Sequence, residues 1–316
     1  MSAALASLLL PDFWIGVATI AGIYAIFTLG LQLSFGLTGM LNFGQAGFMA
    51  IGTYAMGLLV ADYGWPFWAS LPAAGLLAMA AAVLVGLPSL RLRADYFAIA
   101  TVAFAEIARY VAQNAGFTGG NQGVLGFDSA WLDLSDRILA ALKPLGLGTR
   151  LDLPLLLAVW ACFAVLAPAL ALAKRTPWGR VLRAIREDED AAAALGKNVL
   201  AFRLQALALS ALLAAVAGWF LALQVTFIYP SEFEPMFTFF GYAILVLGGL
   251  GSFAGVALGS LLLWVVLEGT RLLDLPLSAE QFAALRFVIV GLILVLLTSL
   301  RPQGLLGRRQ EMVLRR

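Results

Sequence analysis

The stretch from Lys174 to Asn198 reads KRTPWGRVLRAIREDEDAAAALGKN, and it is the one long polar segment of helical character in a chain that is otherwise largely apolar. Thr176 can N-cap a helix that has Pro177 at its first position. Gly196 stands where a C-capping glycine belongs. The pattern therefore predicts one short helix with defined ends.

The predicted helix has two distinct faces, because apolar positions recur near helical spacing and charged positions lie between them. The apolar positions are Val181, Leu182, Ile185 and Ala192, and the polar ones are Arg180, Arg183, Arg186 and the run from Glu187 to Asp190. One interpretation is an amphipathic helix at a membrane surface, with its arginines at phospholipid headgroups. The four consecutive acidic residues disfavour a purely lipid-facing role, because an anionic leaflet repels them. They suit a protein surface, so we also expect a docking segment.

Composition places the rest of the chain in a membrane. Hydrophobic residues make up 62% of the 316 residues and charged residues 12%, which is too few to cover the surface of a water-soluble domain. The net charge of +2 is too small to suggest nucleic-acid binding. Histidine is absent and the single cysteine, Cys162, lies in an apolar run, which disfavours metal binding, disulfides and most enzyme chemistry. We expect an all-α, polytopic membrane protein.

A helix that crosses a bilayer needs about 20 mostly apolar residues. By this measure the chain predicts about nine spans in a single transmembrane domain that covers residues 1–316. The expected spans are residues 13–33, 44–61, 67–87, 96–114, 153–173, 204–227, 237–250, 253–272 and 282–300.

The basic residues predict the orientation, because cytoplasmic loops are enriched in Lys and Arg. Basic residues concentrate at 91–93, at 174–203 and from Arg301 onward, and the loops between these segments carry acidic residues instead. This pattern predicts a cytoplasmic C-terminus and, with nine spans, an outward N-terminus. Residues 115–152 would then be an outward-facing loop, with Trp131 as an anchor at the membrane interface. Residues 174–198 would lie in the cytoplasm.

Two glycine-rich stretches interrupt the apolar pattern. Residues 33–52, LSFGLTGMLNFGQAGFMAIG, combine five glycines with polar side chains at membrane depth. Irregular backbone inside a membrane must be protected by protein or line a water-filled path, and broken helices often form the substrate sites of transporters. Close packing of helices through the glycines is the alternative. A second stretch, 241–260, contains a predicted tight turn at Gly248–Gly251. The candidate translocation-pathway residues are Asn42, Phe43, Gly44, Gln45, Gly249 and Gly251.

Glu106 and Arg109 stand three residues apart in an apolar segment, on one face of a predicted helix. A charge in hydrocarbon costs at least about 2.5 kcal/mol, so pairing with each other or with a neighbouring helix is favoured over a role in the pathway. Motifs of nucleotide, metal or serine hydrolases are missing from the sequence. We therefore expect no catalytic residues, no metal and no cofactor in this chain.

Five stretches carry a resemblance to a known family. They are GLTGMLNFGQAGFMAIGTYA (36–55), RLRADYFAIATVAFAEIAR (91–109), GRVLRAIREDEDAAAALG (179–196), LVLGGLGSFAGVALG (245–259) and RPQGLLG (301–307). In this order they resemble the permease subunits of branched-chain amino acid ABC importers, and within that family the longer of the two paired permeases. The family's T-G-G-x-x-G pattern is matched by residues 118–123, whereas its serine-leucine-glycine-histidine sequence is replaced by Asn42-Phe43-Gly44-Gln45.

The resemblance implies an ATP-driven importer in the bacterial inner membrane. The chain would pair with a second homologous permease, sit on two cytoplasmic ATPase subunits and receive its solute from a periplasmic binding protein. The segment 174–198 would be the coupling helix, with Arg180, Arg183, Ala184 and Glu187 at the ATPase. The solute would be a branched-chain amino acid or, as in related importers, urea, a short amide, or an aromatic or dicarboxylic acid. The residues alone also leave open a self-sufficient carrier or channel, and a membrane-bound enzyme or anchor.

Overall fold

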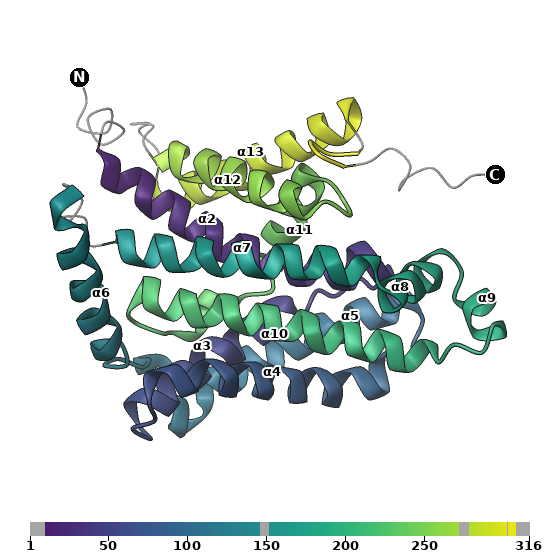
Figure 1. Cartoon of the computed structure of the whole chain (residues 1–316), viewed down its shortest axis with the longest axis horizontal. Helices are drawn as coiled ribbons and strands as arrows, with labels where there is room; N and C mark the ends of the chain where they lie inside the picture. The colour runs from purple at the N-terminus through teal and green to yellow at the C-terminus, as the bar shows by residue number, and fades with distance from the viewer. Residues whose placement is uncertain (1–9, 146–151, 272–277, 302, 308–316) are drawn as a thin grey trace.

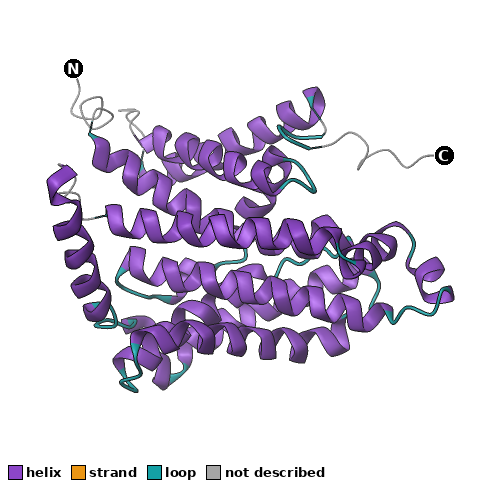
Figure 2. Ribbon diagram, in the orientation of Figure 1, coloured by secondary structure: helices purple, strands orange, loops and turns teal. Residues whose placement is uncertain are grey.

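The computed structural model describes residues 10–145, 152–271, 278–301 and 303–307, and in these residues the chain is helical almost throughout (Figures 1 and 2). The α-helices are α2 (Pro11–Leu31), α3 (Gln45–Ala61), α4 (Phe67–Ser89), α5 (Ala94–Asn114), α6 (Ser129–Leu142), α7 (Leu153–Arg175), α8 (Pro177–Glu187), α9 (Glu189–Ala194), α10 (Val199–Val225), α11 (Met236–Gly248), α12 (Phe253–Arg271) and α13 (Ala279–Leu300). A π-helical segment, η1 (Gln32–Leu37), continues α2. The short 3-10 turns are η2 (Gly116–Thr118), η3 (Gly120–Gln122), η4 (Lys143–Leu145) and η5 (Pro230–Phe233).

Helices occupy all nine positions at which apolar runs predicted membrane spans. In the described part of the chain, five are long and apolar enough to cross a membrane: α2 with η1, α4, α7, α10 and α12. The apolar helices α3 and α11, and residues Ala284–Leu296 of α13, are shorter. The expected all-helical fold is therefore confirmed, and the number of crossings stays a prediction.

Helix α10 is the centre of the bundle. It packs against α3, α4 and α2, while α7 and α12 both pack against α2. The backbones of α3 and α10 approach most closely where both carry small residues. A Cβ atom on Gly52 would lie 2.4 Å from Ala215 Cα, and one on Gly218 would lie 2.1 Å from the Met49 carbonyl oxygen. Glycine at these positions lets the two helices touch along their backbones.

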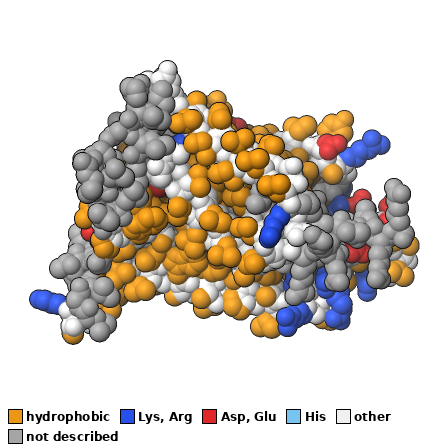
Figure 3. Space-filling view, turned by 90° about the horizontal axis from the view of Figure 1, so that it is seen from above, with side chains coloured by type: hydrophobic (Ala, Val, Ile, Leu, Met, Phe, Trp, Pro, Cys, Tyr) orange, Lys and Arg blue, Asp and Glu red, His pale blue; other side chains and the backbone are white. Residues whose placement is uncertain are grey.

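The two ends of the bundle differ. Most long helices run along the long axis in Figure 1, α6 lies across one end, and α8 and α9 lie at the opposite end. We call these the α6 end and the α8 end. Hydrophobic side chains cover the middle of the face shown in Figure 3, and Lys and Arg gather toward the α8 end. Large apolar side chains such as Leu84 and Val165 are more than two-thirds exposed at 76% and 70%, as expected of a lipid-facing surface.

Residues 115–152 contain a helix that the sequence did not reveal. Helix α6 is amphipathic, and its buried residues Trp131, Ser135 and Leu139 share one face. The Trp131 ring is stacked on Phe67, with ring centroids 6.4 Å apart. The prediction that Trp131 anchors the chain at a membrane interface is wrong, because its ring packs into the protein at the start of α4.

Candidate functional site

The segment that begins at Thr176 forms two helices. The Thr176 hydroxyl accepts a hydrogen bond from the Gly179 amide at 3.4 Å, and Pro177 is the first residue of α8, as predicted. Helix α8 ends at Glu187, because Asp188 adopts an extended conformation. The prediction of a single helix is therefore wrong.

Asp188 starts the second helix. Its carboxylate accepts a hydrogen bond from the Ala191 amide at 2.9 Å and caps α9, which ends two residues before Gly196. Gly196 has a φ of +76°, the conformation expected of a glycine just past a helix end. An ion pair between Glu189 and Arg203 ties α9 to the first turns of α10.

Helix α8 lies tightly against the end of α7. A Cβ atom on Gly179 would be 2.5 Å from the Lys174 carbonyl oxygen and 2.6 Å from that of Ala173. Leu182 and Ile185 follow on the same face and are buried, at 0% and 2% exposure. The apolar face of α8 is therefore already occupied by the chain's own bundle.

The opposite face of α8 exposes Arg180, Ala184 and Glu187. Their spacing of four and three residues places them in one stripe, which we call the α8 stripe. Arg183 does not belong to it. The Arg183 guanidinium is partly buried and donates from Nε to the Gly179 carbonyl and from Nη2 to the Lys174 carbonyl, both at 3.4 Å. It braces the turn between α7 and α8.

Two further cations, which the sequence did not single out as site residues, connect this segment to the bundle. Lys174 Nζ donates to the Gly251 carbonyl at 3.0 Å. Arg186 Nη1 donates to the Gly36 carbonyl, in η1, at 2.6 Å. Their partners lie 77 and 150 residues away along the chain, so no local pattern could have revealed these contacts.

A buried polar cluster lies where the irregular backbone between η1 and α3 meets α10. Asn42, Gln45 and Ser210 are each 0% exposed. Asn42 Nδ2 donates to Gln45 Oε1 at 2.9 Å, and Gln45 Nε2 donates to the carbonyls of Ser210 at 3.2 Å and Phe27 at 3.3 Å. The Ser210 hydroxyl donates to the Gly30 carbonyl at 2.8 Å. This cluster joins α2, α3 and α10.

The amide groups at the start of α3 are engaged by protein side chains. The amides of Phe43 and Ala46 donate to the hydroxyls of Thr101 and Thr238, at 3.0 and 3.1 Å. The Gly44 amide donates to Asn42 Oδ1 at 3.0 Å. These three amides of the backbone break are therefore satisfied within the protein, as a membrane interior requires.

Phe43 differs from its buried neighbours and lies in a group of aromatic rings. Its ring centroid is 5.1 Å from that of Phe239, which is 50% exposed, and 5.0 Å from that of Tyr242. Phe35 of η1 lies 5.7 Å from Tyr242 in an edge-to-face arrangement. We call these four residues, Phe35, Phe43, Phe239 and Tyr242, the aromatic cluster. Of the four predicted residues in the break, only Phe43 contributes to it.

Gly249 and Gly251 form the turn between α11 and α12, as predicted, and have φ values of +104° and +79°. Residues 303–307 cover this turn, because the amides of Leu305 and Leu306 donate to the carbonyls of Leu247 and Gly248 at 2.9 and 3.0 Å. A Cβ atom on Gly249 would lie 2.4 Å from the Gly307 amide nitrogen. These two glycines are therefore packed beneath the end of the described chain.

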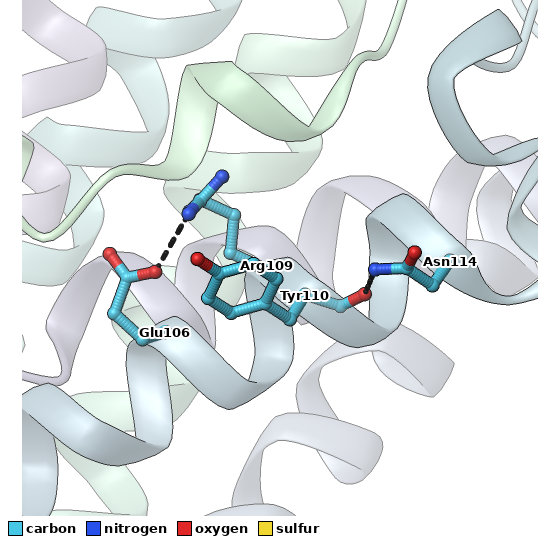
Figure 4. A network of polar contacts seen from close by, with 4 residues as sticks. All are labelled: Glu106, Arg109, Tyr110 and Asn114. Carbon is cyan, nitrogen blue, oxygen red and sulfur yellow. Dashed lines mark hydrogen bonds and ion pairs between the residues drawn. The ribbon is translucent and has the colours of Figure 1, made fainter.

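Glu106 and Arg109 form an ion pair on α5 (Figure 4). Arg109 donates from Nε and Nη2 to Glu106 Oε2, at 3.0 and 2.9 Å. The guanidinium also lies over the Tyr110 ring, 4.7 Å from its centroid. The side chains of Glu106 and Arg109 are 33% and 17% exposed, so the pair lies at the edge of the bundle.

The loop between α10 and α11 holds a second polar contact. The Tyr229 hydroxyl donates to the Glu232 carboxylate, and this hydrogen bond together with burial raises the pKa of Tyr229 to about 12. The loop also pairs with the segment after α5, through an isolated bridge between Val124 and Ile228. In the residues described, no three His, Cys, Asp or Glu side chains come together in a way that could hold a metal ion.

Comparison of the sequence with known proteins identifies relatives of this chain. Residues 13–298 match the protein family described as "Branched-chain amino acid transport system / permease component". The chain is 37% identical over 308 residues to the "High-affinity branched-chain amino acid transport system permease protein LivM" of Escherichia coli K12, an alignment that covers 92% of this chain and 69% of the relative. It is 28% identical over 331 residues to the probable LivM of Methanocaldococcus jannaschii, covering 91% of each. It is 27% identical to Escherichia coli LivH, covering 92% of this chain and 93% of the relative. No solved structure matches the chain significantly.

Proposed function

Because the chain belongs to the family of permease components of branched-chain amino acid transport systems, we propose that it forms part of the membrane path of an ATP-driven importer for these amino acids. It is a multi-pass membrane permease. Hydrolysis of ATP would take place in two separate cytoplasmic subunits, and a periplasmic binding protein would deliver the solute. The permease would lie in a bacterial inner membrane, between the cytoplasmic ATPase subunits and the periplasmic binding protein.

The second permease of the complex would be a homologue of this chain. The chain is similar both to LivM and, more distantly, to LivH of the same organism, and both are named as permeases of high-affinity branched-chain amino acid transport. Two related permeases in one organism support a pair of unequal but homologous halves.

The α8 stripe is the observation that carries the proposal. Arg180, Ala184 and Glu187 form an open, charged surface on a helix whose apolar face is already buried. A helix held in this way is rigid, and its exposed side chains suit a groove on a soluble subunit. We propose that the α8 stripe contacts an ATPase subunit and that Arg183 holds the α7–α8 turn in place.

The aromatic cluster is the part of the predicted pathway that can meet a solute. Asn42, Gly44 and Gln45 use their polar groups within the bundle, and Gly249 and Gly251 support the adjacent turn. Phe43 and Phe239 instead present apolar rings, which suit the aliphatic side chain of a branched-chain amino acid. The Glu106–Arg109 pair is proposed to stabilise α5 and not to contact the solute.

The proposed orientation has nine crossings, an outward N-terminus and a cytoplasmic C-terminus. The basic residues of the α8 end support it, because positive charge favours the cytoplasmic side. Under this orientation α6 lies on the periplasmic surface, where the binding protein would approach.

The test is reconstitution of the chain in proteoliposomes with its two ATPase subunits, the second permease and the binding protein. We expect uptake of radiolabelled leucine that needs ATP and survives ionophores. The charge reversal Arg180→Glu with Glu187→Arg should release the ATPase subunits and abolish uptake, whereas Lys197→Ala, at an exposed cation in the same segment, should do neither. ATP-independent uptake driven by an ion gradient would refute the proposal.

A further inference from the structure

We infer that Arg186 is a positioning residue that joins α8 to the π-helical end of the first span, so that η1 moves with α8. The inference rests on the proposed role of α8 as the helix that meets the ATPase. It assigns a function to a side chain on the inner side of α8, away from the exposed α8 stripe.

The contact occurs at a carbonyl group that needs a partner. Gly36 lies near the C-terminal end of η1, where helix carbonyls have no partner within the helix. Arg186 Nη1 reaches this oxygen at 2.6 Å, the short distance of a charge-assisted hydrogen bond. A cation at a helix C-terminus also meets the negative end of the helix dipole. One side chain from α8 thus caps the helix that begins at Pro11.

The end of η1 is shaped around this arginine. Gly39 has a φ of +74°, and its amide donates to the Phe35 carbonyl at 3.0 Å, which closes the helix end. A Cβ atom on Gly39 would lie 3.3 Å from Arg186 Cγ, so a larger residue there would press on the arginine stem. Glycine at this position both permits the turn and leaves space for Arg186.

A second set of contacts closes the connection into a ring. Gln32, in the first turn of η1, is fully buried, and the end of its side-chain amide lies against the backbone amides of Gly251 and Ser252, from which its oxygen accepts hydrogen bonds when the amide is turned to face them. The Gly251 carbonyl in turn accepts from Lys174 at the end of α7. Contacts therefore run from α7 through the α11–α12 turn and η1 to Arg186, and back along α8. A shift of α8 must carry η1 with it or break this ring.

The segment η1 is suited to be the part that moves. A π-helix is rare and lacks regular α-helical hydrogen bonding, and the backbone that follows it, up to Gly44, is irregular. Phe35, the residue next to Gly36 in η1, contacts Tyr242 in the aromatic cluster. Force applied at Arg186 would therefore reach the aromatic cluster through a single short segment, by direct contacts.

The experiment compares Arg186→Ala, Arg186→Gln and the control Lys197→Ala in the complete transporter complex in proteoliposomes. We expect Arg186→Ala to keep its ATPase subunits and hydrolyse ATP while leucine uptake per ATP falls about tenfold, which corresponds to about 1.4 kcal/mol of coupling. Arg186→Gln keeps a polar side chain, but its amide ends too far back to reach the Gly36 carbonyl, so uptake per ATP should fall nearly as far as in Arg186→Ala. Lys197→Ala should match the unmodified protein. A purely structural role would lower hydrolysis and uptake together, and would lower the melting temperature.

Two results would overturn the inference: uptake per ATP in Arg186→Ala within twofold of the control, or loss of the ATPase subunits from that variant. The second result would make Arg186 a docking residue. If Arg186→Ala does not accumulate, the ratio measured for Arg186→Gln decides in the same way. Failure of the proposed function would be seen in a different experiment: the ATPase subunits would stay bound after charge reversal of the α8 stripe.

Discussion

The contact between α3 and α10 provides the sharpest test of the packing, through the substitution Gly52→Ala. A Cβ atom at this position would lie 2.4 Å from both Cα and the carbonyl oxygen of Ala215, whereas ordinary contacts begin at 3.4 Å. These are backbone atoms and cannot rotate away. The two helices must therefore separate locally by about 1 Å to admit one methyl group.

The expected loss of stability follows from three contributions. Overpacking of a close-packed interface costs about 1–3 kcal/mol. The separation also breaks the hydrogen bond from Thr53 Oγ1 to the Gly218 carbonyl, now 2.8 Å long, and such bonds contribute about 0.6 kcal/mol on average in membrane proteins. Alanine returns up to about 1 kcal/mol through its higher helix propensity. The net prediction is a destabilisation of about 1–3 kcal/mol.

The assay is thermal unfolding of the purified permease in one detergent, compared with Gly16→Ala. Gly16 lies in α2 and has no atom within 4 Å of its would-be Cβ, so this control makes the same chemical change without a clash. We expect Gly52→Ala to melt several degrees below the unmodified protein and Gly16→Ala to melt at or slightly above it. Equal melting temperatures for the two variants would refute the close approach of α3 and α10.

Three further predictions address other sites. Gly179→Ala places a methyl group 2.5 Å from a backbone oxygen of α7, so we expect α8 to shift and leucine uptake to fall about tenfold or more, with unchanged protein level in the membrane. The hydrogen bond to Glu232 favours neutral Tyr229, so the folded protein keeps the phenol proton to a higher pH than the unfolded chain does. The free energy of unfolding should therefore decline between pH 10 and about 12. Tyr229→Phe should remove one phenolate from the absorbance titration near pH 12. A double-mutant cycle of Glu106→Gln and Arg109→Gln should give a coupling energy of about 1 kcal/mol in unfolding, and a value near zero would mean that the pair is not formed in the membrane.

The helices could be predicted where membrane physics leaves little choice. A run of apolar residues of the right length must be helical in a bilayer, so the predicted and observed starts coincide for α4 at Phe67, α7 at Leu153 and α12 at Phe253. The capping chemistry at Thr176 and Pro177 is equally local, and it placed the start of α8 correctly.

The prediction failed where a polar residue had two possible meanings. The acidic run after Ile185 suggested one charged face on a continuous helix. In the structure Asp188 caps a new helix, with Glu189 and Asp190 in its first turn, which is where acidic residues favour the helix dipole. In α6 the polar Ser135 stands between Trp131 and Leu139 on the buried face, so the apolar stripe of this helix is interrupted.

The remaining features of the candidate site depend on contacts between residues that are far apart in the chain. Polar groups at the depth of Asn42 and Gln45 could line a water-filled path or satisfy one another, and the sequence cannot distinguish these cases. The partner that decides is Ser210, 165 residues from Gln45, which belongs to the helix that follows the α8–α9 segment. The contacts of Lys174 and Arg186 are of the same kind, because each cation reaches a distant backbone carbonyl.

The burial of Leu182 and Ile185 bears on the competing interpretation of α8 as a helix that lies on lipid. An interfacial helix must turn a broad apolar face to the membrane, with its basic residues on the other side. In this protein that face is used against α7 and the bundle, and the face left open carries Arg180, Ala184 and Glu187. Alanine is the only apolar side chain of that stripe, and too small to hold a helix in a bilayer, whereas paired opposite charges can select a protein surface. The arginines differ in exposure: Arg183 and Arg186 are half-buried and donate to backbone carbonyls of the bundle, whereas Arg180, which donates to the Arg175 carbonyl at 3.2 Å, remains exposed on the open face.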